Sequence, residues 1–193
     1  GLVWEQALWA NTEKEGENNF AWTFWPKHPK MFSKHLNTYG VKKYEERQFE
    51  SVFIGSFTTN KRIGNWQSAI ENFWMGRPND RLYAHEKYLE FLSLNKFGLS
   101  LPGVGPKCLR DIELIGLGTV PIFTPGVSTQ YFEPLQKDKH YLYAETPVEV
   151  RDVIKNCTEE KWKYISNNCV EWYQRNCSPL GSYKLTEKII NIK

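Results

Sequence analysis

The sequence has no long hydrophobic run: nowhere in its 193 residues do 18 or more apolar residues follow one another. A helix that crosses a bilayer needs about 20 such residues, so we predict no membrane span. The apolar stretch at residues 1–10 is interrupted by Glu5 and Gln6, which a secretory signal peptide would not carry. These absences favour a cytoplasmic protein.

The sequence also has little excess of one charge sign over the other. Lys and Arg number 25 against 22 for Asp and Glu, which gives a net charge of +3 at pH 7. The basic residues form short, scattered clusters such as residues 42–43 and 137–139. Nucleic-acid-binding domains concentrate a larger positive charge on one face, so we expect no nucleic-acid partner.

Cysteine is sparse, and its spacing matches no zinc-ligand pattern. Four cysteines are also few for a disulfide scaffold. We therefore predict free thiols in a reducing compartment. The four residues are Cys108, Cys157, Cys169 and Cys177.

Two common nucleotide-binding motifs are missing. No Gly-x-Gly-x-x-Gly follows the first predicted strand, and no phosphate loop ending in Gly-Lys-Ser/Thr occurs. The first absence argues against the usual dinucleotide-binding domain, and the second argues against a P-loop nucleotidase.

Aromatic residues, by contrast, are abundant, with eight Trp, ten Tyr and eleven Phe. Large rings fill cores, and they also stack on the apolar faces of sugars. For any single Trp the core is the more frequent role. The run at residues 20–25 therefore has two interpretations: it packs an N-terminal extension onto the main domain, or it forms a platform for an acceptor sugar.

Strand and helix patterns alternate from residue 51 onward, which is typical of an α/β fold. We predict a Rossmann-like parallel sheet with helices on both faces, spanning residues 51–193, after an aromatic-rich extension or reduced acceptor region at residues 1–50. The charged residues 42–48 are interpreted as a linker or exposed turn. Predicted strands cover residues 51–55, 97–101, 119–123 and 140–143, and predicted helices cover 65–75, 85–94, 107–117, 147–156 and 158–175.

The first candidate site is the turn at residues 55–62, directly after the first predicted strand. A glycine there allows close backbone approach to an anion, hydroxyl groups donate hydrogen bonds, and an arginine offers a bidentate charge for phosphate. The alternative is a polar loop whose hydroxyls cap a helix. The residues concerned are Gly55, Ser56, Thr58, Thr59 and Arg62.

The second candidate site is the glycine-rich turn at residues 102–107, which contains Gly103 and Gly105 and leads into a predicted helix. A helix N-terminus presents unpaired N–H groups and a partial positive charge, which suits a diphosphate.

Three charged residues recur at every third position along that helix: Lys107, Arg110 and Glu113. This spacing places them on one face, which we predict to lie opposite the buried stripe. Lys107 and Arg110 would then meet phosphate oxygens, and Glu113 would accept hydrogen bonds from ribose. The alternative is a surface ion pair between Arg110 and Glu113.

These segments carry a family resemblance. Residues 97–122 (FGLSLPGVGPKCLRDIELIGLGTVPI) resemble the donor-binding core of exostosin-like GT-B glycosyltransferases. Within this family, the segment is similar to xylosyltransferases of large algal viruses. Residues 53–62 (FIGSFTTNKR) and 131–141 (YFEPLQKDKHY) resemble CAP10-like protein O-glucosyl/xylosyltransferases. Both families use a GT-B donor domain.

The resemblance implies transfer of a sugar from a UDP-sugar, with xylose a candidate, to a glycan or glycoprotein hydroxyl. No Asp-x-Asp motif occurs, which fits a reaction that needs no metal or other cofactor. The implied diphosphate ligands are Gly55, Ser56, Thr58, Arg62, Lys107 and Arg110. A full GT-B enzyme has two Rossmann-like domains, however, and this chain has room for one.

The general base is not evident from the sequence. Glu5 is the best candidate, although the polar face of a short helix is the more frequent role for such a residue. The four histidines are interpreted as structural or exposed. Because one domain is not a whole GT-B enzyme, the alternative function is a non-catalytic module that binds a nucleotide sugar or carbohydrate.

Overall fold

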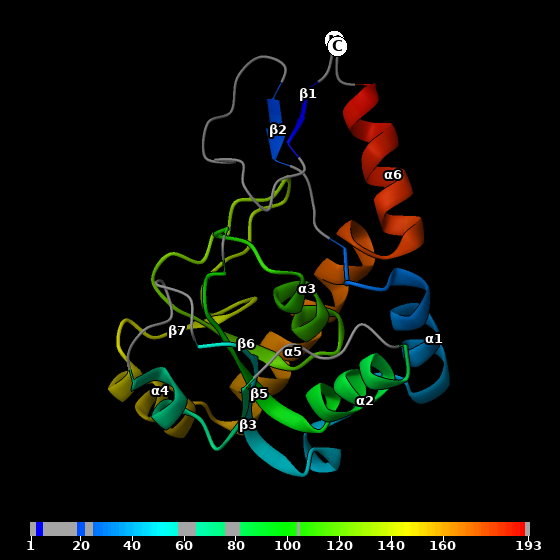
Figure 1. Ribbon diagram of the computed structural model, residues 1–193. Helices are drawn as coiled ribbons and strands as arrows, with labels where there is room; N and C mark the ends of the chain where they lie inside the picture. The colour runs from blue at the N-terminus through cyan, green and yellow to red at the C-terminus, as the bar shows by residue number, and fades with distance from the viewer. Residues whose placement is uncertain are drawn as a thin grey trace.

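The computed structural model describes residues 3–5, 19–21, 25–57, 65–75, 82–103 and 105–191 (Figure 1). Most of them form a five-stranded sheet covered by helices. A separate pair of short strands, β1 (Val3–Glu5) and β2 (Asn19–Ala21), run parallel to each other. Within the described residues, no helix is both long and apolar enough to cross a membrane.

The main sheet confirms the predicted α/β class. Its strands are all parallel and lie in the order β4-β3-β5-β6-β7. After β3 the chain moves to one side for β4 and then crosses to the other side for β5. The order therefore changes direction between β3 and β5, which makes this pair the switch point of the sheet. The strands are β3 (Phe49–Gly55), β4 (Asn72–Met75), β5 (Asn95–Ser100), β6 (Val120–Phe123) and β7 (Leu142–Tyr143).

The helices form two groups, as the prediction of helices on both faces requires. Helices α1, α2, α3, α5 and α6 contact one another in sequence around the sheet, whereas α4 contacts η3 and β7 (Figure 1). The bounds are α1 (Pro29–Tyr39), η1 (Tyr44–Glu46), η3 (Asn65–Ala69), α2 (Leu82–Ser93), α3 (Leu109–Gly116), α4 (Pro147–Lys155), α5 (Glu159–Asn176) and α6 (Pro179–Ile190).

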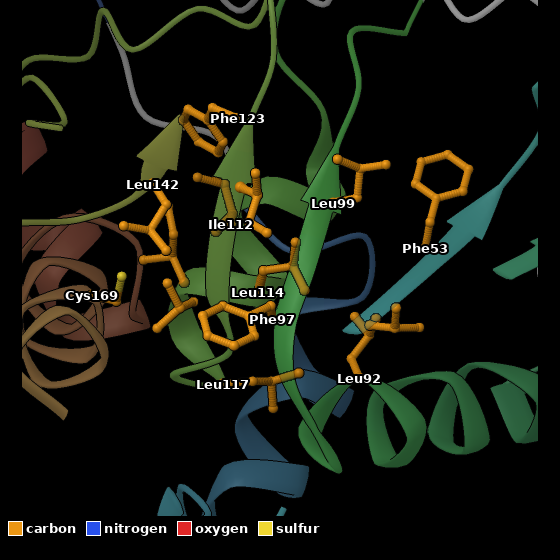
Figure 2. Packing of buried hydrophobic residues seen from close by; sticks show 14 of the residues in the cluster. Phe53, Leu92, Phe97, Leu99, Ile112, Leu114, Leu117, Phe123, Leu142 and Cys169 are labelled. Carbon is orange, nitrogen blue, oxygen red and sulfur yellow. The ribbon is translucent and has the colours of Figure 1, made fainter. Parts of the chain in front are cut away.

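Part of the core lies between the sheet and α3 (Figure 2). Leu99 on β5 and Leu114 on α3 are fully buried, together with Ile112. Gly98 lets α3 approach β5 closely, because a Cβ at this position would overlap the side chain of Leu114. Burial of such side chains contributes roughly 1.5–3 kcal/mol each, so this contact anchors α3 to the sheet.

Several predicted elements are confirmed, and one is wrong. Helices occur where expected at α2, α3, α4 and α5, and Thr158 caps α5 by accepting a hydrogen bond from the Lys161 N–H at 3.2 Å. Residues 65–75, however, form η3 and then β4 instead of a helix. Phe73 pairs with Phe53 across the two parallel strands. A short apolar run fits the periodicity of a helix and of a strand alike, and pairing with β3 makes residues 72–75 a strand.

Residues before position 50 contribute to the same core. Helix α1, which the sequence patterns did not predict, packs against α2 and buries Phe32 completely. The domain boundary at residue 50 stays a prediction. Helix α6 is likewise an addition: Ser178 and Pro179 end α5 as expected, and Ser178 also caps a new helix by accepting from the Gly181 N–H at 3.0 Å.

Arg47 corrects the interpretation of residues 42–48 as an exposed linker. Its side chain is 4% exposed and reaches the amino-terminal edge of the sheet. It donates to the carbonyl groups of Lys42, Ser93, Asn95 and Leu117 and to the Thr119 hydroxyl, at 2.7–3.2 Å. The guanidinium therefore ties together the segments that begin β3, β5 and β6.

Candidate functional site

The two turns predicted to bind an anion begin side by side at the switch point. β3 ends at Gly55 and β5 ends at Ser100, and these parallel strands are neighbours in the sheet. Ligands of doubly wound sheets bind outside the carboxyl ends of the strands, at the point where the strand order changes direction. The strand order, which no local pattern reveals, thus brings residues 55–57, 101–103 and 105–107 to one edge of the sheet.

Arg110 on α3 bridges the ends of the two strands. Its Nη1 donates to the Ile54 carbonyl and its Nη2 to the Leu101 carbonyl, both at 3.2 Å. The guanidinium also lies over the Phe53 ring, 4.5 Å from the ring centre. These contacts use two of the five N–H donors of the guanidinium. The Nε–H is buried without a hydrogen-bond partner in the described residues, so the cation keeps donor capacity at the switch point.

Gly55 leaves the space that the Arg110 guanidinium needs beside β3. A Cβ at Gly55 would lie 3.1 Å from Nη1 of Arg110 and 3.0 Å from the Phe53 ring. Both contacts are tight, so a side chain at position 55 would displace the guanidinium or the ring. The glycine that the sequence predicted for close approach of a ligand already permits close approach within the protein.

Glu113 lies one turn after Arg110 and accepts hydrogen bonds from two donor groups. Its Oε1 accepts from the Lys27 N–H at 3.0 Å, and its Oε2 accepts from the Tyr88 hydroxyl at 2.7 Å. The His85 Nε2 is 3.5 Å from Oε1. Burial, together with the nearby Glu113 charge, raises the pKa of Tyr88 well above its ordinary value, so Tyr88 stays a hydrogen-bond donor.

The N-terminus of α3 already holds an internal carboxylate. Asp111 accepts from the Cys108 N–H at 3.0 Å and from the Ser100 hydroxyl. In the turn before the helix, the Gly103 N–H donates to the Gly105 carbonyl at 3.0 Å. A negative side chain near a helix N-terminus is stabilising. Asp111 therefore offsets part of the positive potential that the sequence assigned to a ligand.

Lys107 is fully buried, and its Nζ lies 4.4 Å from the centre of the Tyr131 ring. A cation over an aromatic face is attracted by the negative charge of the ring face, most strongly when water is excluded. Burial raises the pKa of Tyr131 well above its ordinary value, so its hydroxyl stays neutral. Lys107 thus places a second cation behind the turn that follows β5.

The predicted exposure of one face of α3 is wrong. Lys107, Arg110 and Glu113 are 0%, 8% and 2% exposed, and every residue from Arg110 to Gly116 is buried. Helix α3 is short and is covered by α2, α5 and the sheet, so it has no solvent face. The alternative of a surface ion pair is also wrong: both side chains are buried, and in the described part of the chain they form no ion pair with each other.

The remaining predicted residues have different outcomes. Ser56 follows β3 and is half-buried, and Gly103 and Gly105 are buried in the turn after β5. Glu5 belongs to the short strand β1, and its side chain is not described. Thr58, Thr59 and Arg62 lie outside the described residues.

Sequence reasoning missed the residues that surround Glu113. His85 and Tyr88 lie three positions apart on α2, and their rings stack with centres 5.1 Å apart. The His28 ring meets His85 edge-on at 4.6 Å. The three-residue spacing was a usable signal, since such residues share a helix face. The partner on α3 was not predictable, because it depends on how two helices pack.

Comparison with known proteins does not assign the chain. No protein-family model matches it, and no curated protein is significantly similar to it. The resemblance of residues 53–62 and 97–122 to glycosyltransferases therefore stays a prediction from the sequence.

Proposed function

We propose that this chain is the donor-binding part of a GT-B-type glycosyltransferase that takes a UDP-sugar, with UDP-xylose the first candidate. The observation that carries the proposal is the position of Arg110. Its guanidinium sits at the switch point, between the two turns that the sequence patterns and the family resemblance assign to the diphosphate. A buried cation with unused donors at this place in a doubly wound sheet suits a nucleotide diphosphate.

The cations would act mainly on the leaving group. When the sugar is transferred, the bond between the anomeric carbon and the diphosphate oxygen breaks, and UDP leaves with the electron pair. Arg110, with Lys107 behind it and with Arg62, seven positions after β3 in the sequence, would stabilise the negative charge that develops there. Such stabilisation by fixed side chains needs no metal.

The acceptor side would supply the rest of the reaction. A glycan hydroxyl attacks the anomeric carbon, and a general base takes its proton. Glu5 is our candidate for this base, since it lies in the N-terminal segment that we assign to the acceptor side. A module that binds the donor without transfer is the alternative, and it differs from the enzyme in turnover rather than in binding.

The proposal is tested by the thermal stability of the chain with UDP, UDP-xylose, UDP-glucose, GDP-fucose and NAD. A ligand at about one hundred times its Kd should add roughly 2.7 kcal/mol, or several degrees in Tm. We expect stabilisation by UDP and by one UDP-sugar, but not by NAD. A folded sample that responds to none of these nucleotides would overturn the proposal.

Three variants make the test specific. Arg110→Lys keeps the charge but cannot bridge both carbonyl groups, and Arg62→Ala removes the arginine of the first turn; each should weaken UDP binding about tenfold or more. Arg151→Ala removes an exposed arginine on α4 that donates to the Ser68 carbonyl at 3.2 Å, and it should leave binding unchanged. A transfer assay with the stabilising sugar then separates the enzyme from the binding module.

A further inference from the structure

Residues 25–28, which we call the strap, contact three helices that lie far from them in the sequence. The Trp25 indole N–H donates to the Ser182 hydroxyl on α6 at 2.8 Å. The Lys27 N–H donates to Glu113 Oε1 on α3 at 3.0 Å. The His28 ring packs edge-on against His85 of α2. The strap is thus held by side chains that lie far from it in the sequence.

The strap occupies a carboxylate beside the candidate donor site. Glu113 is 2% exposed; its Oε1 accepts from the Lys27 N–H, its Oε2 accepts from the Tyr88 hydroxyl, and the His85 Nε2 lies 3.5 Å from Oε1. Tyr88 and His85 belong to α2, which is fixed in the helix layer. Of these partners, the Lys27 N–H alone comes from a segment outside the helices and strands. A ligand hydroxyl that takes the place of the Lys27 N–H at Oε1 would displace the strap.

We propose that the strap is a latch on the donor site. It holds Glu113 when the site is empty, and it is released when a hydroxyl of the bound nucleotide takes the place of the Lys27 N–H. This inference rests on the proposed function, since it requires a nucleotide beside Arg110. Release of residues 25–28 frees the segment that leads back to β2, so donor binding is coupled to the N-terminal part of the chain.

The latch predicts that loosening its far end improves nucleotide binding. When only the open form binds, the apparent Kd equals the intrinsic Kd divided by the open fraction. A typical hydrogen bond changes such an equilibrium about fivefold. Ser182→Ala removes the acceptor of the Trp25 indole without touching Glu113, and it should lower the Kd for UDP about fivefold. Trp25→Phe, which removes the donor, should act in the same direction.

The experiment combines calorimetry with amide hydrogen exchange on the full chain. UDP titrations give the Kd for wild type, Ser182→Ala, Trp25→Phe and the control Thr186→Ala, which removes a hydroxyl from α6 one turn later. Hydrogen exchange reports the Lys27 amide directly. We expect this amide to exchange faster in Ser182→Ala than in wild type, and faster in wild type once UDP is bound.

The outcomes distinguish the latch from the function on which it rests. If wild type binds UDP but Ser182→Ala leaves the Kd unchanged or raises it, the latch is wrong and the donor site stands. Unchanged protection of Lys27 on UDP binding would also overturn the latch. If no form of the protein binds UDP, the proposed function and the latch both fail.

Discussion

At the scale of single residues, two buried arginines lie at opposite edges of one sheet. Arg47 lies at the edge where β3, β5 and β6 begin, and Arg110 lies where β3 and β5 end. Arg47 directs its donors to five groups of the protein, which leaves it no role for a ligand. Arg110 makes two such bonds and keeps donors in reserve. Burial therefore does not distinguish the two arginines, whereas the number of hydrogen bonds that each donates within the protein does.

Arg47 should be one of the most sensitive positions for stability. Arg47→Met would leave buried acceptors such as the Asn95 and Leu117 carbonyls without partners, and each costs about 1–3 kcal/mol. We expect a total loss above about 3 kcal/mol, measured as a lower midpoint of urea unfolding at an unchanged slope. Arg151→Met, at an exposed site, should change stability by less than about 0.5 kcal/mol. A loss below about 1 kcal/mol for Arg47→Met would contradict this account.

His140 should make stability depend on pH. Its Nδ1 accepts from the Gln136 N–H at 3.0 Å, and burial lowers the pKa of His140 to about 4, below its ordinary value of 6.5. The unfolded chain therefore takes up a proton first as the pH falls. The stability from neutral His140 is complete above pH 6.5 and is lost as the pH falls toward 4.

The loss from His140 should reach at most about 3 kcal/mol. Burial also lowers the pKa of His35, so His35 makes a second contribution to the pH dependence of stability, and the His140 variant keeps it. His140→Asn keeps an acceptor near Nδ1 but does not titrate, so its free energy of unfolding should fall less between pH 7.5 and 4. Equal slopes for variant and wild type in urea unfolding at several pH values would rule out this role.

At the scale of elements, helix α3 depends on close approach to β5. A Cβ at position 98 would overlap Leu114, and overpacking of this kind typically costs about 1–3 kcal/mol. We therefore expect Gly98→Ala to destabilise the protein, as measured by urea unfolding. Leu114→Ala alone should cost about 2–5 kcal/mol, because it leaves a cavity.

The double variant separates this contact from a general effect. In Gly98→Ala/Leu114→Ala the new methyl group enters space that the leucine has left, so the combined cost should fall short of the sum by about 1 kcal/mol or more. Strictly additive costs would mean that the contact between position 98 and Leu114 does not set how closely α3 approaches β5.

The elements show which local signals the sequence carries. Thr158 before α5 and Ser178 with Pro179 after it are strong boundary signals, and the helix begins and ends between them. Residues 65–75 carry an ambiguous apolar pattern, and pairing of Phe73 with Phe53 makes part of this segment a strand. Helix α1 was missed because its short buried face includes His35 rather than a regular apolar stripe.

At the scale of the whole molecule, the alternation of strands and helices predicted the class, but only the structure shows the strand order. That order decides the site, because it makes β3 and β5 neighbours and joins two turns about fifty positions apart in the sequence. The periodicity of Lys107, Arg110 and Glu113 predicted one shared helix face, but Lys107 precedes α3 and all three side chains are buried. Burial of α3 depends on α2 and α5, which local patterns do not position.

The central claim is that the switch point between β3 and β5 binds the diphosphate of a UDP-sugar through Arg110. The most direct measurement is the Kd for UDP, by calorimetry, of wild type, Arg110→Lys and Arg151→Lys. Our account predicts that wild type and Arg151→Lys bind alike, and that folded Arg110→Lys binds about tenfold more weakly or worse. Equal UDP affinity of all three proteins, or no binding by any of them, would contradict it.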